Sequence, residues 1–186
     1  MLKTKGTDVV ALKRLLARDG GKAAAEVERR LTPELGDVFH RIVATSWTPV
    51  EQQMAIYLAA AAVLFPDEGE PMEALGYTLA ESAFRGAYKI FLRIPSIEFI
   101  MTRAAKVWRS YYEKGDAGIE NVTNTGLDFV VRNLPELPPP MRTMAKGHIR
   151  FLTEAAGMKN VRVTLHDSDP WVFRWTIRWH VHQETR

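Results

Sequence analysis

The last part of the chain alternates between apolar and polar residues with the two-residue period of a β-strand. Side chains of a strand point alternately to opposite faces of a sheet, so the odd-numbered apolar positions are expected to face the core together. Residues 161–166 show the same alternation, and Asp167 can pair with Trp171 across the loop 168–170, which predicts a hairpin. The set expected in the core comprises Trp171, Phe173, Trp175, Ile177, Trp179 and Val181.

The first 114 residues instead repeat their apolar positions every three or four residues, a period typical of amphipathic helices. Thr32 followed by Pro33 is a typical helix start, and Pro49 and Pro95 open two further helices. The segment 54–65 is apolar on all sides, which predicts the central helix of a helical layer. The expected helices span residues 9–18, 22–31, 33–43, 49–65, 72–94 and 95–114.

Several of these helices carry a recognisable packing face. Asp8 is the expected cap of the first helix, and apolar stripes that include Val43 and Val107 are expected to be buried. The fifth helix carries a seam of small residues at spacings of three and four, which lets another helix approach closely. That seam comprises Gly76, Ala80, Ala83 and Ala87.

Beyond residue 114 the order of predicted elements becomes strand, strand, helix, strand, strand. Two short strands flank the turn 124–126, a helix runs from residue 141 to its C-cap Gly157, and the hairpin follows. Helices first and antiparallel strands afterwards predict an α+β fold with an N-terminal helical layer packed on a four-stranded antiparallel sheet. We expect one domain over residues 1–186, with a helical part (1–114) and a sheet-containing part (115–186).

The composition excludes several classes of site and partner. The 186 residues include no cysteine, which rules out disulfides, thiolate metal sites and cysteine nucleophiles. The net charge is only +3, and no nucleic-acid partner is expected because such proteins usually show a denser basic stripe. The longest apolar run is too short for a membrane span, and the N-terminus lacks a secretory signal pattern. A cytoplasmic location is therefore expected.

The polar face of the C-terminal hairpin is the first candidate for function. Histidines two apart on a strand could bind a metal, but the neighbouring arginines would repel a cation, so no metal is expected. The aromatic residues of the hairpin face the other way and cannot stack on bases. A docking surface for a protein partner or for a second copy in a homodimer is left open beside a simply solvated face. The residues of this face are Arg162, His166, Arg174, Arg178 and His180, with His182 beyond.

The sequence predicts no catalytic residue. His40 with Glu51, or His148 with Glu154, could be drawn as an acid–base pair, but each is more simply a surface or helix residue. No glycine-rich phosphate loop, nucleophile elbow or HExxH motif occurs. Enzymatic activity and a cofactor are therefore not expected.

Several stretches resemble a paralogous family abundant in myxobacteria, whose members have a similar length. They include SWTPVEQQMAIYLAAAAVLF (46–65), ALGYTLAESAFRGAYKIF (74–91), MAKGHIRFLTEAAGMKNVRVTLHD (144–167) and FRWTIRW (173–179). More distantly, the plan is similar to the vinyl-4-reductase-type domain, the haem nitric-oxide-binding domain and the small core subunits of the TRAPP tethering complex. The resemblance extends from about Asp8 and rests on Trp47, Gly76, Ala80, Glu81, Gly86, Trp108, Tyr112, Gly115, Gly147, Gly157 and Trp179.

This chain departs from the three more distant families at the residues that carry their chemistry. The cysteine-based zinc site of vinyl-4-reductase-type domains and the acyl-bearing cysteine of TRAPP subunits are missing, because the chain has no cysteine. Haem-binding relatives use a proximal histidine and a Y-x-S-x-R motif. Neither GYTLAE (76–81) nor another stretch supplies that motif, so no haem is expected. The resemblance still implies an apolar cavity between helices and sheet and a tendency to dimerise.

Two functions are compatible with these patterns. The first is a non-enzymatic sensory or regulatory module of a bacterial protein, which binds a small apolar ligand between helices and sheet. The second is a protein–protein interaction or dimerisation domain with a solid core, which acts through its helical face or the Arg/His face of its sheet. The residues expected to line the ligand pocket are Tyr77, Tyr88, Trp108, Tyr111, Phe129 and Trp175.

Overall fold

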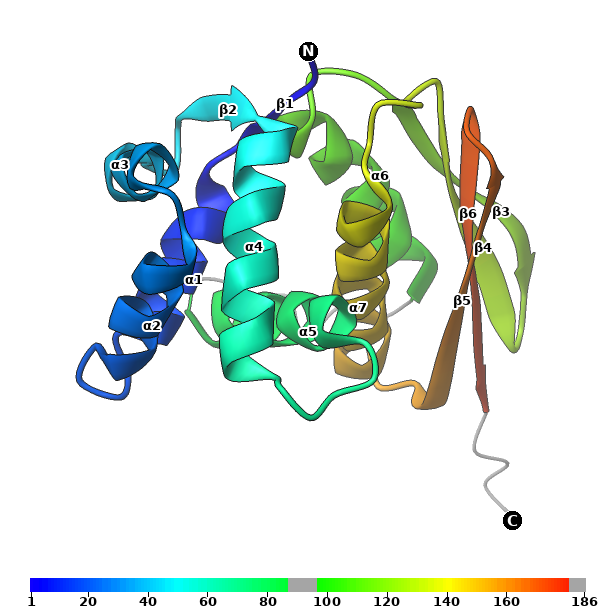
Figure 1. Cartoon of the computed structure of the whole chain (residues 1–186). Helices are drawn as coiled ribbons and strands as arrows, with labels where there is room; N and C mark the ends of the chain where they lie inside the picture. The colour runs from blue at the N-terminus through cyan, green and yellow to red at the C-terminus, as the bar shows by residue number, and fades with distance from the viewer. Residues whose placement is uncertain (87–96, 181–186) are drawn as a thin grey trace.

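The computed structural model describes residues 1–86 and 97–180, and these form a layer of helices packed on one face of a sheet (Figure 1). This arrangement confirms the predicted α+β class. The helices are α1 (Thr7–Leu16), α2 (Lys22–Arg30), α3 (Pro33–Arg41), α4 (Val50–Leu64), α5 (Pro71–Gly86), α6 (Ile97–Tyr111) and α7 (Pro139–Ala155). The strands are β1 (Lys3–Lys5), β2 (Trp47–Pro49), β3 (Asp116–Thr123), β4 (Gly126–Arg132), β5 (Lys159–Asp169) and β6 (Val172–His180).

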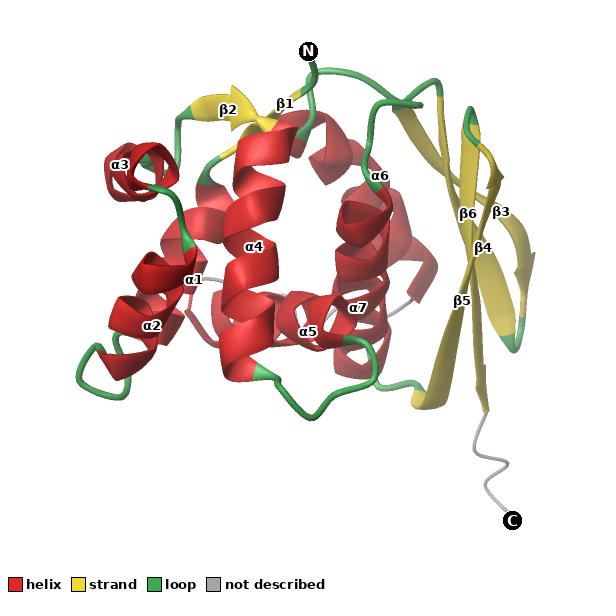
Figure 2. Cartoon of the chain, in the orientation of Figure 1, coloured by secondary structure: helices red, strands yellow, loops and turns green. Residues whose placement is uncertain are grey.

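The larger sheet is antiparallel, with its strands in the order β3-β4-β6-β5. After the β3–β4 hairpin, α7 carries the chain to the far edge, where β5 begins. β5 then turns back as β6, which lies between β4 and β5. Helices cover the inner face of the sheet, and no helix covers the outer face in the part of the chain described (Figure 2). The predicted order strand, strand, helix, strand, strand is confirmed.

A second, smaller sheet joins β1 to β2 and was not predicted. Lys3 lies opposite Pro49, and the N–H of Val50 donates to the carbonyl of Leu2 at 3.0 Å. The pairing ties the N-terminus to the start of α4. Three-residue strands are too short to show a period in the sequence, so only the tertiary pairing reveals them.

Alternation along β6 separates an apolar inner face from a charged outer face, as predicted. Trp179 is only 5% exposed, whereas 31% of the Arg174 side chain and 51% of the Arg178 side chain are exposed. The residues of β6 with no exposed surface are Phe173, Trp175 and Ile177.

The prediction of burial is wrong for Trp171, which is 58% exposed. Asp169 pairs with Val172, so Pro170 and Trp171 form a two-residue turn and do not belong to the strand ladder. The Asp169 carboxylate accepts a hydrogen bond from the N–H of Trp171 at 2.8 Å, which holds this residue in the turn. Val181, expected in the same apolar set, lies outside the described residues.

The register of this hairpin differs from the predicted one by two residues. Leu165 lies opposite Trp175 rather than opposite Phe173, its predicted partner. An irregularity between His166 and Asp169 shifts the pairing by one further residue, so that Asp169 lies opposite Val172 and two residues remain in the turn. A shift of two residues returns every side chain to its original face, so the predicted faces survive the change of register.

The predicted helix starts are confirmed for α3 and shifted for α1. The hydroxyl of Thr32 accepts a hydrogen bond from the N–H of Leu35 at 3.3 Å, so Thr32 caps α3 as predicted. α1 begins at Thr7, and its predicted cap Asp8 lies inside the first turn. The carboxylate of Asp8 does not cap the helix and instead lies near His148, as described below.

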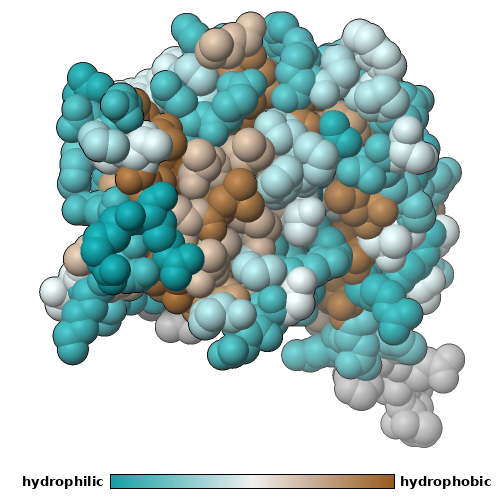
Figure 3. Space-filling view, in the orientation of Figure 1, coloured by the Kyte–Doolittle hydropathy of each residue, from teal (hydrophilic) through white to brown (hydrophobic). Residues whose placement is uncertain are grey.

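Two predictions of burial in the helical layer are wrong. α3 ends at Arg41, so Val43 lies in the following loop and is exposed. Val107 lies on an exposed side of α6. α4 packs against α2, α3, α5 and α7, as expected for the central helix of the layer, but it exposes Leu58 on its outer side. Figure 3 shows apolar residues gathered at the surface over α4.

Among the described helices, none combines the length and the apolar character needed to cross a membrane.

α5 and α7 pack backbone against backbone through two glycines. A Cβ added at Gly76 would lie 2.0 Å from the carbonyl oxygen of Met144. A Cβ added at Gly147 would lie 2.0 Å from the carbonyl oxygen of Glu73. The predicted seam of small residues therefore accommodates α7. Within that seam Gly76 and Ala80 are buried, Ala83 is exposed, and Ala87 lies outside the described residues.

This contact predicts a large cost for Gly147→Ala. The added methyl group must push α7 away from α5, so we expect the free energy of unfolding to fall by about 3 kcal/mol. Denaturant unfolding monitored by tryptophan fluorescence measures this change in the free energy of unfolding. The control is Gly36→Ala in α3, where a Cβ meets nothing within 4 Å and where alanine should stabilise the helix by about 0.5–1 kcal/mol. Equal stability of both variants would contradict the prediction.

Candidate ligand-binding groove

Three of the predicted pocket residues meet in the core between α6 and the sheet. The ring of Trp108 lies 6.2 Å from that of Phe129 and 6.3 Å from that of Trp175, centroid to centroid. The Trp175 N–H donates to the carbonyl of Arg142 at 3.1 Å, which fixes this indole against α7. Rings at these separations contact one another, so the space between them is filled by the side chains themselves.

The other three predicted pocket residues are placed differently. Tyr77 lies between α5 and α7, where its hydroxyl donates to Glu154 at 2.7 Å. That hydrogen bond, together with burial, raises the pKa of Tyr77 to about 12. Tyr111 is half-buried against the core, and Tyr88 lies outside the described residues. The structure therefore brings together Trp108, Phe129 and Trp175, and the role of the set in ligand binding stays a prediction.

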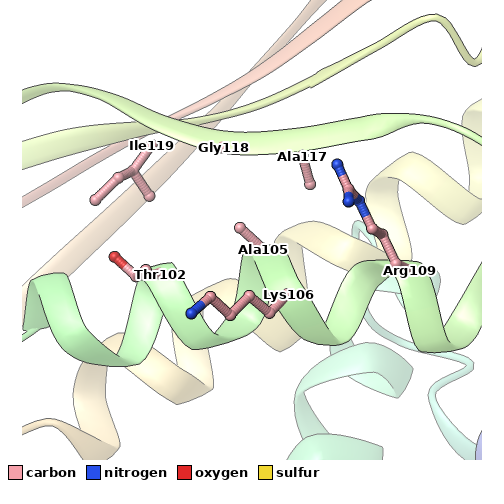
Figure 4. Close-up of a pocket in the computed structure, with 7 residues that line it drawn as sticks. All are labelled: Thr102, Ala105, Lys106, Arg109, Ala117, Gly118 and Ile119. Atoms are coloured by element: carbon pink, nitrogen blue, oxygen red, sulfur yellow. The ribbon is translucent and has the colours of Figure 1, made fainter.

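A groove of about 390 Å³ lies between α6 and β3, at the edge of the helix–sheet interface (Figure 4). Its apolar lining comes from both layers. Ala105 points from α6 toward the strand, and Ile119 points from β3 toward the helix. The polar lining comes from α6 alone. The lining residues are Thr102, Ala105, Lys106, Arg109, Ala117, Gly118 and Ile119.

The sheet pairing places the floor of this groove beside the aromatic cluster. Ile119 lies directly opposite Phe129, and Ala117 lies opposite Val131. Phe129 and Val131 are buried on the inner face of β4. Because directly opposed residues in an antiparallel pair project to the same face, Ala117 and Ile119 also project inward. The groove is therefore an outer continuation of the core.

The rim of the groove is cationic. Arg109 forms an ion pair with Asp116 at 3.7 Å, and both side chains are exposed. Lys106 forms no ion pair with any side chain that the structure describes. An apolar floor beside an uncompensated ammonium group is suited to a molecule with an apolar body and an anionic end.

Sequence reasoning did not find this groove. Thr102, Lys106 and Arg109 recur at spacings of four and three, so they share one face of α6. That spacing was visible in the sequence as a polar stripe on the helix. The stripe forms part of a groove only because β3 lies beside it, and the sequence did not specify that neighbour.

All five residues of the predicted interaction face lie on β5 and β6, on the outer side of the sheet. Arg162 lies opposite Arg178, and His166 lies opposite Arg174. His180, at the end of β6, is exposed. Among the described residues, no cluster of three or more histidine or carboxylate side chains could hold a metal ion.

Two carboxylates from neighbouring strands neutralise part of this face. Arg174 donates to Asp128 at 2.7 Å and lies 3.4 Å from Glu120. Arg132 donates to Glu120 at 2.6 Å. Arg178 lies 3.8 Å from Asp128. Burial raises the pKa of Asp128, but hydrogen bonds, including that from Arg174, outweigh it, so the pKa lies below its usual value.

Neither acid–base pair considered from the sequence, His40 with Glu51 or His148 with Glu154, is formed. The Nε2 atom of His40 lies 3.5 Å from Glu28, and both side chains are exposed. The Nε2 atom of His148 lies 3.6 Å from Asp8 rather than beside Glu154. Because Asp8 is in α1 and His148 is in α7, this contact links the first helix of the chain to the last.

The fold is similar to that of several solved domains. An Fe(II) unliganded H-NOX protein mutant from K. algicida matches with a TM-score of 0.68 at 11% identity, over 98% of this chain and 100% of that one. An H-NOX protein from S. oneidensis in the Fe(II)NO ligation state gives 0.66 at 12% identity, over 95% and 99%. An oxygen-binding H-NOX domain related to soluble guanylate cyclases gives 0.62 at 12% identity, over 95% and 93%. No protein-family model matches the chain, and no similar curated protein was found.

These matches confirm the expected likeness to the haem nitric-oxide-binding domain at the level of the fold. At such low identity they show the fold alone, because one fold can host unrelated functions. The likeness to vinyl-4-reductase-type domains, to TRAPP subunits and to a myxobacterial family stays a prediction.

The described residues do not fit a haem with histidine or cysteine ligation. A haem iron is commonly held by an imidazole or a thiolate, and the chain has no cysteine. The ring of His148 is engaged by the Met144 carbonyl at 3.0 Å and by Asp8. His182 lies outside the described residues. The remaining histidines are exposed: His40, His166 and His180.

The His148–Asp8 pair predicts a pH-dependent contribution to stability. Burial lowers the pKa of His148, but Asp8 and the Met144 carbonyl outweigh it, so the folded-state pKa lies above the ordinary value of about 6.5. The contribution is therefore complete below about pH 6.5 and is lost as pH rises through the higher folded-state pKa. We expect the stability gap between the wild type and His148→Gln to narrow as pH rises.

Urea unfolding between about pH 5 and 9 measures this gap. The exposed His40 provides a control, because His40→Gln leaves the contact between α1 and α7 intact. Asp8→Asn should reproduce the effect of His148→Gln. A gap that stays constant across the pH range would show that the pair does not titrate as described.

Proposed function

We propose that this chain is a non-enzymatic sensory or regulatory module that binds a small ligand in the groove between α6 and β3. The observation that carries the proposal is the groove itself, with about 390 Å³ of space, an apolar floor and a cationic rim. Ligand pockets commonly have volumes of about 300–1,000 Å³. The fold supports the same role, because similar domains were solved in an Fe(II)NO ligation state and as an oxygen complex.

The lining indicates the chemistry of the ligand. Ala105, Ala117 and Ile119 offer an apolar surface to a short hydrocarbon chain or ring. Lys106 then offers an ammonium group to a carboxylate or another anion at one end. Arg109 is already paired with Asp116, and its guanidinium points away from the ammonium group of Lys106, so Lys106 is the cation that such an anion would meet (Figure 4).

The position of the groove supplies a route for a signal. A ligand there touches α6 on one side and β3 on the other, so its affinity depends on the separation of the two layers. Binding therefore favours conformations in which α6 and β3 have the spacing that the ligand fits. A cytoplasmic location and a homodimeric state, both expected from the sequence, remain part of the proposal.

Calorimetric titration with three matched probes tests the proposal: octanoate, 1-octanol and octylamine. We expect octanoate to bind most tightly, because only its head group complements Lys106. Lys106→Ala should weaken octanoate binding about three- to fivefold, as for an exposed ion pair, and should leave 1-octanol binding unchanged. Ala105→Phe fills the groove and should abolish binding of all three.

The control for charge is Lys22→Ala, which removes an exposed cation from α2, on the far side of the helical layer (Figure 1). It should bind octanoate as the wild type does. Native mass spectrometry of protein purified from its own host should show a bound small molecule that Ala105→Phe loses. Unchanged octanoate binding by Ala105→Phe, or no binding of any probe together with no co-purified molecule, would overturn the proposal.

A further inference from the structure

β5 is an edge strand with one side unpaired. The strand order β3-β4-β6-β5 leaves β6 as its single strand neighbour among the described residues. β5 spans Lys159–Asp169, eleven residues, and contains no proline. An edge strand of this length presents a row of backbone N–H and C=O groups that can pair with a further strand. The inner face of β5 packs toward the core through Val163, which is buried.

The outer face of the sheet has an uneven charge distribution. Its carboxylates, Glu120 and Asp128, lie on β3 and β4 and engage the arginines of β4 and β6. The acidic residue that β5 contributes to this face is Asp169, at the turn into β6, and its carboxylate accepts a hydrogen bond from the N–H of Trp171. The side chains of Arg162 and His166 have no ion-pair or hydrogen-bond partner within the described part of the chain. Along the length of β5 before the turn, the free edge therefore carries no carboxylate on this face.

The pairing of β5 with β6 makes this charge distribution unfavourable while no partner is bound to the sheet. Arg162 lies directly opposite Arg178. Like charges in directly opposed positions destabilise an antiparallel pair. An acidic side chain placed on the free side of β5 would lie next to Arg162 and would relieve this repulsion.

We infer that β5 accepts an acidic, extended segment of a partner protein as an additional strand of the sheet. Main-chain hydrogen bonds to the free edge would supply affinity, and carboxylates facing Arg162 and His166 would supply specificity. This inference is independent of the groove, which lies beside β3 at the opposite edge of the sheet.

A second copy of this chain would leave Arg162 without a carboxylate. In a symmetric antiparallel pairing of two β5 strands centred on Thr164, Arg162 of each copy would face His166 of the other. The guanidinium would gain no acidic partner in such a pair, whereas a carboxylate-bearing strand would supply one.

Fluorescence anisotropy with a labelled peptide of alternating glutamate and valine tests the inference. We expect this peptide to bind at least about tenfold more tightly than its lysine–valine counterpart. Arg162→Glu should weaken binding about tenfold, because it removes one attraction and adds one repulsion. Lys22→Glu is the matched control on α2 and should bind the peptide as the wild type does.

Backbone pairing is tested with two versions of the peptide that are N-methylated on alternate residues. A strand that adds to β5 uses only one of its edges, so one methylated version should lose binding and the other should retain it. Equal binding of both versions, or unchanged binding by Arg162→Glu, would overturn the inference. So would peptide-sensitive self-association in light scattering, which would identify a second copy as the occupant. Tighter binding of a single-stranded oligonucleotide than of the peptide would likewise overturn it.

Discussion

The alternation of side chains along β6 is the constraint on which the rest of the structure depends. It directs Phe173, Trp175 and Ile177 into the interior, where they have no exposed surface. Trp175 then contacts Trp108 of α6 and bonds to the Arg142 carbonyl of α7, so one strand positions both helices that cover the sheet. The same alternation sends charged residues of β6 to the outer face. A core and a charged surface thus arise from one two-residue period.

The helical layer depends on a different kind of contact. α5 and α7 meet through Gly76 and Gly147, whose missing side chains let each helix approach a carbonyl oxygen of the other. Close packing of this type leaves little freedom in the position of α7. Since α7 also supplies the acceptor for the Trp175 N–H, the glycine contact and the aromatic core support each other. The Asp8–His148 contact extends this support to α1.

The two edges of the sheet differ in their chemistry. At the β3 edge, α6 runs alongside the strand and encloses an apolar groove with cationic residues at its rim. At the β5 edge, the strand has no further strand neighbour among the described residues, and the outward side chain of Arg162 has no ion-pair partner there. A small amphipathic anion suits the first edge and an acidic strand suits the second. A ligand at one edge and a partner at the other would be joined by the same sheet, which gives a sensory module a physical connection between input and output.

The sequence by itself determined the class of the fold, the order of the helices and of the four longer strands, and the inward faces of the last two strands, because those follow from local periods of two and of three to four residues. The local sequence also predicted the helix cap at Thr32 and the burial of Trp175 and Trp179. Tertiary structure alone decided the register of the last hairpin, the exposure of Trp171 in its turn, and the packing of α6 beside β3. A period repeats along one element and carries no information on which residue of a second element lies opposite, so pairing and sites between layers emerge only when the elements pack.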